Sequence, residues 1–93
     1  MEDKQIIQLY FDRSEDAIRE TAQVYGRYLF TIAQRILQHE EEAEETVNDT
    51  YHSAWNAMPP TKPNVLKAFL TTIARRIAIK RYHRKLRHNV IPS

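Results

Sequence analysis

The chain has 93 residues, which fits one small domain, and 42% of them are hydrophobic, enough to bury a core. It contains no cysteine, which excludes a disulfide framework and a cysteine-based zinc site, and no run of about 18 apolar residues that could span a membrane. The net charge of +2 is unevenly divided, because all 12 acidic residues lie between Glu2 and Asp49, whereas the chain from Thr50 onward carries nine basic residues and no acid.

This division of charge indicates two kinds of partner. Like charges gathered in one half of a chain repel each other and do not serve folding. The basic half suits a polyanion, and the acidic half suits a basic protein surface or simple solvation. The N-terminus has no basic segment followed by an apolar one, so no signal peptide is predicted and we expect a cytoplasmic protein.

The chain begins with a short predicted helix over residues 4–11, followed by a long one. Ser14 is a suitable N-cap for the second helix, with Glu15 and Asp16 in the first turn, where the helix dipole favours acids. Gly26 within this helix indicates close packing against a neighbour or a slight kink. The apolar stripe of the helix recurs every three or four residues and comprises Ile18, Ala22, Tyr25, Leu29, Ile32, Ala33 and Ile36.

A third helix is predicted over residues 41–57, with a core stripe and an opposing polar face. The core stripe comprises Ala43, Val47, Thr50, Tyr51 and Ala54, with Trp55 beside it. At about 100° per residue, the opposite face carries Glu41, Glu45, Asn48, Asp49, His52 and Asn56. Spacing alone favours a solvated face whose first acids complement the helix dipole, and the alternative is a docking face for a basic partner.

Residues 58–64 are predicted to form a loop, because three prolines within five residues cannot continue a helix. A fourth helix is predicted over residues 64–86. Its apolar stripe becomes charged after Ile77, which predicts that the helix runs past the edge of the bundle. Its cations suit phosphate neutralisation, with a solubilising surface or an acidic protein partner as alternatives; they are Arg75, Arg76, Lys80, Arg81, Arg84, Lys85 and Arg87.

The predicted core takes one stripe from each long helix. It comprises Ile18, Ala22, Leu29, Ile32, Ile36, Val47, Ala54, Leu66, Leu70 and Ile73. No catalytic constellation accompanies it, since the histidines have no paired nucleophile and a helix spreads neighbouring acids around its circumference. The sequence therefore predicts neither an enzyme nor a cofactor nor a metal site.

Two segments carry a resemblance to a known family. The segment 43–55, Ala-Glu-Glu-Thr-Val-Asn-Asp-Thr-Tyr-His-Ser-Ala-Trp, resembles region 2.2 of extracytoplasmic-function (ECF) sigma factors. Sigma factors are the subunits of bacterial RNA polymerase that recognise promoters. The segment 69–75, Phe-Leu-Thr-Thr-Ile-Ala-Arg, resembles the family's regions 2.3 and 2.4. Each motif is weak alone, but two in the right order, separated by a short loop, are specific.

The resemblance implies an all-α fold, a four-helix sigma region 2 bundle with a long basic C-terminal helix. It implies that the third helix docks on the clamp helices of the largest subunit of the RNA polymerase core, through Glu41, Glu45, Asn48, Asp49 and His52. It also implies that the loop and the fourth helix bind the non-template strand of the promoter minus-ten element and help to melt it, with one base flipped into a loop pocket. The predicted DNA-binding residues are Met58, Thr61, Lys62, Asn64, Arg75, Arg76, Lys80, Arg81, Arg84 and Lys85.

The sequence departs from the family at three positions. Phe69 stands where tryptophan is usual, and Arg76 and Lys80 stand where asparagine and aspartate are frequent. Cations there favour phosphate contacts or guanine edges, so the resemblance does not fix which bases this chain recognises. The family also has a second, helix-turn-helix domain. We expect residues 1–88 to form the region 2 domain and residues 89–93 to begin a linker, in a chain cut short rather than a natural one-domain variant.

Two other functions remain open on sequence grounds. One is a helical protein-interaction module, such as a partner of an anti-sigma factor; an anti-sigma factor would also be a further partner of a sigma factor. The other is a stand-alone basic-helix nucleic-acid binder. Salt-dependent DNA binding would argue against the first, and loss of polymerase binding on Asp49→Arg with an intact fold would argue against the second.

Overall fold

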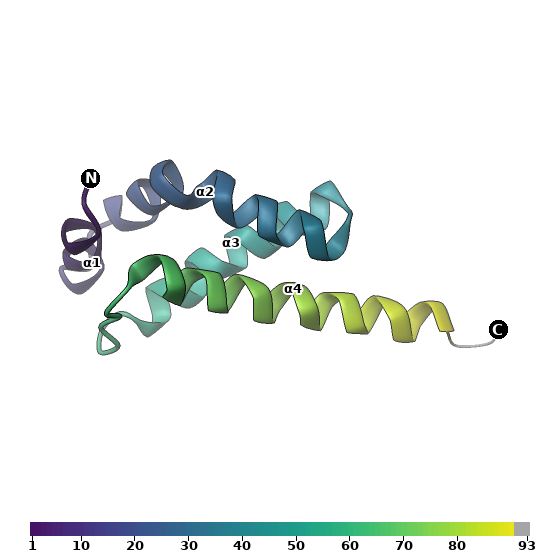
Figure 1. Cartoon of the computed structure of the whole chain (residues 1–93). Helices are drawn as coiled ribbons and strands as arrows, with labels where there is room; N and C mark the ends of the chain where they lie inside the picture. Colours follow the sequence, from purple (N-terminus) through teal and green to yellow (C-terminus); the bar gives the residue numbers. More distant parts are fainter. Residues whose placement is uncertain (91–93) are drawn as a thin grey trace.

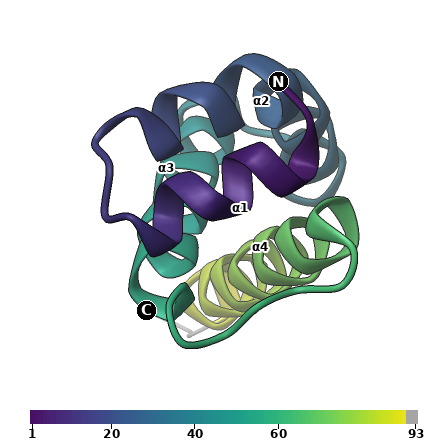
Figure 2. The same cartoon turned by 90° about the vertical axis from the view of Figure 1, so that its left-hand side faces the viewer.

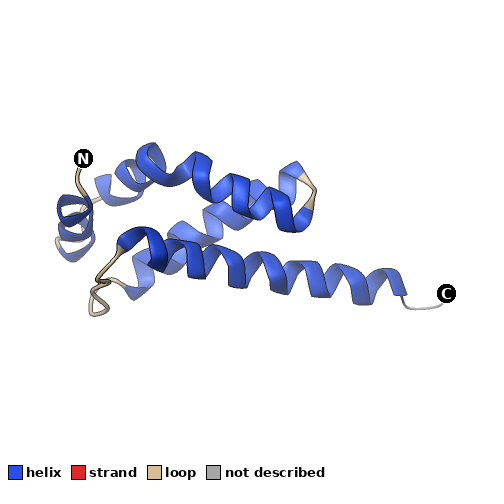
Figure 3. Cartoon of the chain, in the orientation of Figure 1, coloured by secondary structure: helices blue, strands red, loops and turns tan. Residues whose placement is uncertain are grey.

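The computed structural model describes the backbone of residues 1–90 and the side chains of residues 1–87. This part of the chain forms four helices and no strand: α1 (Asp3–Phe11), α2 (Asp16–Leu37), α3 (Glu40–Ala57) and α4 (Leu66–Val90) (Figure 3). The three long helices pack along one another, and α1 lies across one end of the bundle (Figures 1 and 2). The all-α, four-helix prediction is therefore confirmed.

Local capping explains where the first helices begin and end. At the start of α1, the side chain of Gln5 accepts a hydrogen bond of 3.0 Å from the backbone N–H of Glu2, which forms a capping box. The predicted N-cap of α2 is off by one residue: Glu15 occupies that position, and Ser14 Oγ accepts from the backbone N–H of Asp16 at 3.2 Å. Gln38 ends α2 in a left-handed conformation, with φ of 52°.

The buried face of α2 differs from the predicted stripe. Leu29 and Ala33 are buried as predicted, but Ile18, Ala22, Tyr25, Ile32 and Ile36 are only half-buried. The other buried positions are Ala17, Thr21 and Leu37. This helix contacts all three others, and small residues at the centre of the contacts let neighbouring backbones approach, so the larger aliphatic side chains flank that line.

The rest of the predicted core is mostly confirmed. Val47, Ala54, Leu66 and Leu70 are buried, whereas Ile73 is half-buried. A Cβ placed on Gly26 would lie 3.2 Å from the hydroxyl of Tyr51, so this glycine marks the close packing of α2 against α3 that the sequence suggested.

The core also contains polar groups that hydrophobic periodicity does not reveal. Tyr10 of α1 and Thr21 of α2 share a buried hydrogen bond of 2.7 Å, and Thr21 Oγ1 lies 2.8 Å from the carbonyl of Ala17, to which it donates. Thr46 and Thr50 on α3 donate to carbonyls four residues earlier at 2.8 Å. These buried hydroxyls are therefore satisfied, as a low-dielectric interior requires.

The last helix is longer than predicted. It continues through Asn89 and Val90, where the sequence predicted the start of a linker, and residues 91–93 lie outside the described part. A second domain beyond the chain stays a prediction. Within the described residues, no helix is both long enough and apolar enough to cross a membrane.

Candidate functional site

The polar face of α3 points away from the core. Glu41, Glu45, Asn48 and His52 are exposed, and Asp49 is partly covered. Three acids, Glu40, Glu41 and Glu42, occupy the first turn, where the positive end of the helix dipole stabilises them. The predicted polymerase-binding residues therefore share one accessible helix face.

Three ion pairs connect this helix to α4. Arg81 Nη1 lies 3.1 Å from Glu45 Oε1, and Arg81 Nη2 lies 2.9 Å from Asp49 Oδ2. One turn further along α4, Lys85 Nζ lies 2.9 Å from Glu42 Oε2. The prediction that α4 leaves the bundle after Ile77 is thus wrong for its inner face, because Ala78 is still buried and Arg81 and Lys85 still contact α3. Only the end of α4 extends past the other helices (Figure 1).

The ion pairs shift the pKa values of two of their members, Glu42 and Arg81, in the direction that favours the charged form. The hydrogen bond from Lys85 lowers the pKa of Glu42 below its usual 4.5, and the positive charges of Lys85 and Arg81 lower it further. The hydrogen bond to Asp49 raises the pKa of Arg81 further above its already high value. Two of the cations predicted to bind DNA are therefore partly neutralised by acids of the predicted docking helix.

The remaining cations of α4 form an outer face. Arg76, Lys80, Arg84 and Arg87 follow one another at intervals of four, four and three residues, so they lie on one side of the helix, and all are exposed. Arg75 is also exposed, beside an apolar stripe of Ile79, Tyr82 and Leu86. Because α4 carries no acidic residue, this outer face has no compensating charge on its own helix.

The loop between α3 and α4 divides into a buried start and an exposed remainder. Met58, predicted to contact DNA, is fully buried, because its side chain closes the end of the core where α3 stops. Its placement argues against direct DNA contact in this conformation. Thr61, Lys62 and Asn64 are exposed as that prediction requires.

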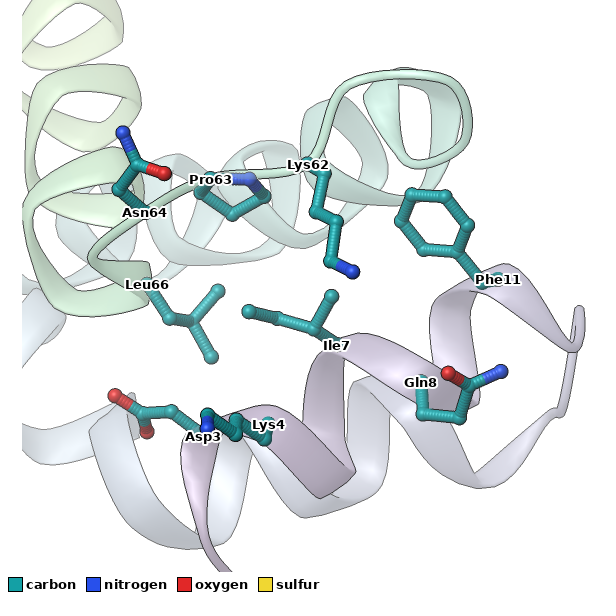
Figure 4. A pocket seen from close by; sticks show the side chains of 9 residues that line it. All are labelled: Asp3, Lys4, Ile7, Gln8, Phe11, Lys62, Pro63, Asn64 and Leu66. Carbon is teal, nitrogen blue, oxygen red and sulfur yellow. The ribbon is translucent and has the colours of Figure 1, made fainter.

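A pocket of about 520 Å³ lies beneath the exposed part of the loop (Figure 4). Lys62, Pro63 and Asn64 form one wall together with Leu66 at the start of α4. The opposite wall comes from α1 and comprises Asp3, Lys4, Ile7, Gln8 and Phe11. The mixture of apolar floor and polar rim suits a small aromatic group with hydrogen-bonding edges.

Sequence reasoning missed three contributions to this region. Glu42 pairs with Lys85, and its position three residues before Glu45 and seven before Asp49 on one helix face was a usable signal. The α1 wall of the pocket and the contacts of Arg13 with the end of α3 had no local signal, because they depend on how the turn after α1 folds back. Among the described residues, no group of His, Cys, Asp and Glu is placed to hold a metal ion.

Comparison with known families identifies this arrangement. The family described as Sigma-70 region 2 matches residues 21–88, which span most of α2, all of α3, the loop and most of α4. Neither a curated protein nor a solved structure gives a significant match. Region 2 is the part of sigma factors that binds RNA polymerase and takes part in promoter recognition. Because the match covers well over half of the chain, this protein belongs to the sigma-70 region 2 family.

Proposed function

We propose that the chain is the promoter-recognition domain of an ECF-type sigma factor, acting in the bacterial cytoplasm. The observation that carries the proposal is the family match over residues 21–88, which takes in the polar helix, the loop and the basic helix in order. The ECF subtype rests on the two motifs, at residues 43–55 and 69–75. An anti-sigma factor that controls access to these surfaces belongs to the same proposal.

In this proposal, the outer face of α3 docks on the clamp helices of the polymerase core. Glu41, Asn48 and His52 are available to a basic partner, and Glu45 and Asp49 would exchange their contacts with Arg81 for contacts with the polymerase. Charges of this kind guide encounter and fix register, and a central one also affects dissociation. Docking would also leave the positive charge of Arg81 less neutralised by the acids of α3.

Promoter DNA would lie along the loop and α4. The outer cations Arg76, Lys80 and Arg84, with Arg75 beside them, would contact backbone phosphates, which set position but carry no sequence information. Base preference would come from the loop and the pocket beneath it, where Thr61, Lys62 and Asn64 present polar groups. An unstacked base of the non-template strand exposes both its edges and its faces, so capture of a flipped base would favour melting.

This division of labour is tested by titrating salt against the binding of single-stranded minus-ten oligonucleotides. Arg76→Ala and Arg84→Ala should weaken binding to all sequences alike and lower the slope of log K against log salt by about 0.7 per lost contact. Lys62→Ala and Asn64→Ala should instead change the preferred base. Arg81→Ala should have a smaller effect than Arg84→Ala, because Glu45 and Asp49 already compensate Arg81.

Arg27→Ala is the matched control, because Arg27 is an exposed cation on α2, outside the proposed surface. If the loop variants change affinity for every oligonucleotide equally while the arginine variants change base preference, the assignment of roles is wrong. If the wild-type chain binds no oligonucleotide even at low salt, a helical protein-interaction module becomes the better account.

A further inference from the structure

Arg13 occupies the turn between α1 and α2, outside the segment that matches the sigma family. Its backbone has a φ of 54°, in the left-handed region that residues other than glycine seldom adopt. The N–H of Arg13 bonds the carbonyl of Tyr10 at 3.1 Å, and the N–H of Ser14 bonds the carbonyl of Leu9 at 2.9 Å. The turn is therefore closed by its own backbone, and the side chain leaves it in a fixed direction.

The guanidinium of Arg13 reaches the point where α3 ends and the loop begins. Its Nη1 donates to the carbonyl of Trp55 at 2.9 Å and to the carbonyl of Met58 at 2.6 Å. Its central carbon lies 3.7 Å from the centroid of the Trp55 ring, in a cation–π contact. The last carbonyls of a helix have no partner within the helix, and the negative end of the helix dipole favours a cation. The Arg13 side chain therefore donates to two carbonyls, contacts the Trp55 ring and places a positive charge at the negative end of the dipole.

Few backbone hydrogen bonds set the direction of the loop. Three of its residues are prolines, which have no N–H to donate, and the N–H of Thr61 bonds the carbonyl of Ala57 at 2.9 Å. Arg13 binds the carbonyls of Trp55 and Met58, which lie on either side of Ala57 in the sequence, so its contacts flank the hydrogen bond between Thr61 and Ala57. The same turn follows directly on α1, which supplies the other wall of the pocket. Arg13 therefore ties the turn after α1 to the start of the loop, and α1 and the later loop residues form the two walls of the pocket.

We propose that Arg13 is a positioning residue: it fixes how the proline loop leaves α3, and through the loop it sets which base the pocket prefers. The proposal rests on the proposed function, because it assumes that the pocket takes a base of the single-stranded promoter. Arg13 itself contacts no DNA in this account. Its removal should alter base choice without altering the phosphate contacts of α4.

The experiment compares Arg13→Met and Arg13→Lys with the wild-type chain, with Arg27→Met as the control of equal charge change on an exposed surface. Trp55 is the single tryptophan, so its fluorescence reports directly whether the cation has left the ring. Amide hydrogen exchange at Thr61, with Leu70 as a core reference, measures the order of the loop. Binding of minus-ten oligonucleotides that differ in one base measures discrimination, and its salt dependence measures phosphate contacts.

We expect Arg13→Met to speed exchange at Thr61 by about tenfold relative to Leu70, because hydrogen bonds from a charged donor are among the stronger ones. Base discrimination should fall by a similar factor, with an unchanged salt slope. Arg13→Lys, which keeps a cation and a donor, should recover part of both effects, and Arg27→Met should change neither.

The outcomes separate this inference from the proposed function. If loop variants change base preference but Arg13→Met leaves both discrimination and Thr61 exchange unchanged, the positioning role is overturned and the proposed function stands. If the wild-type chain has no base preference, base recognition by the pocket fails, and the part of the inference that concerns base choice fails with it. Exchange at Thr61 then still decides whether Arg13 orders the loop.

Discussion

Single residues on α2 show how much burial depends on the neighbours of a helix. Leu29 is fully buried, whereas Ile32, on the same predicted stripe, is half-buried. Leu29→Ala should therefore cost about 2–5 kcal/mol of unfolding free energy, through lost burial and the cavity left behind. Ile32→Ala should cost clearly less, and urea unfolding followed by circular dichroism measures both. Equal costs for the two variants would contradict the observed packing of α2.

This contrast marks what sequence can and cannot predict at the residue scale. Hydrophobic spacing identifies a face to within about one residue, but it cannot tell which of two adjacent lines is central when three helices contact one another. Met58 belongs to the proline-rich loop that the resemblance predicts to bind DNA, yet its apolar side chain closes the core. Arg13 gave no signal at all, because its partners lie more than forty residues away along the chain.

At the scale of helices, the ion pairs between α3 and α4 predict a dependence of stability on pH. The pKa of Glu42 is lower in the folded chain than its usual 4.5, so its contribution is present above that value. It is lost as the pH falls through the lowered pKa, because the protonated carboxyl no longer attracts Lys85. The pair lies near the surface, and such pairs contribute about 0.2–1 kcal/mol.

Lys85→Met should therefore lower the unfolding free energy at pH 7 and have a smaller effect near about pH 3, where a larger fraction of Glu42 is protonated. Lys80→Met is the matched control, because Lys80 lies on the exposed outer face of α4 and should show no such difference between the two pH values. Denaturant unfolding at each pH makes the comparison. A Lys85 effect of the same size at both pH values would rule out the ion pair as its cause.

Helix boundaries were predictable from the sequence to within a few residues, because caps, acids in first turns and prolines are local signals. The contacts between helices were less predictable from the sequence. The basic run of α4 was expected to project freely, but its inner positions return to α3, since Glu42, Glu45 and Asp49 are spaced to meet Arg81 and Lys85. Complementary charge on two predicted helices was visible in the sequence, but which helices would be neighbours was not.

The whole molecule keeps its two proposed surfaces close together while giving each a separate face. The bundle measures 50 × 23 × 21 Å, with α4 along its length and α3 beside it. Glu42, Glu45 and Asp49 lie on the side of α3 that borders α4, so they can pair with cations of α4 or with a basic partner. The resemblance of two short motifs was enough to predict the sigma region 2 family, and the match over residues 21–88 confirms it.

The most direct test of the account is the affinity of this chain for an isolated fragment containing the polymerase clamp helices, measured by titration calorimetry. The wild-type chain should bind, and Glu45→Lys and Asp49→Lys should each weaken binding by at least about tenfold. Because both variants also break a contact with Arg81, Arg81→Ala must be measured beside them: it breaks both contacts but leaves the acids in place, so it should bind at least as well as wild type.

Glu15→Lys, a charge reversal at an exposed position at the start of α2, should bind like wild type, and circular dichroism should show an unchanged helical content for every variant. Loss of binding confined to Glu45→Lys and Asp49→Lys is the result that this account predicts. Wild-type affinity in both of those variants, or no binding by the wild-type chain, would contradict it.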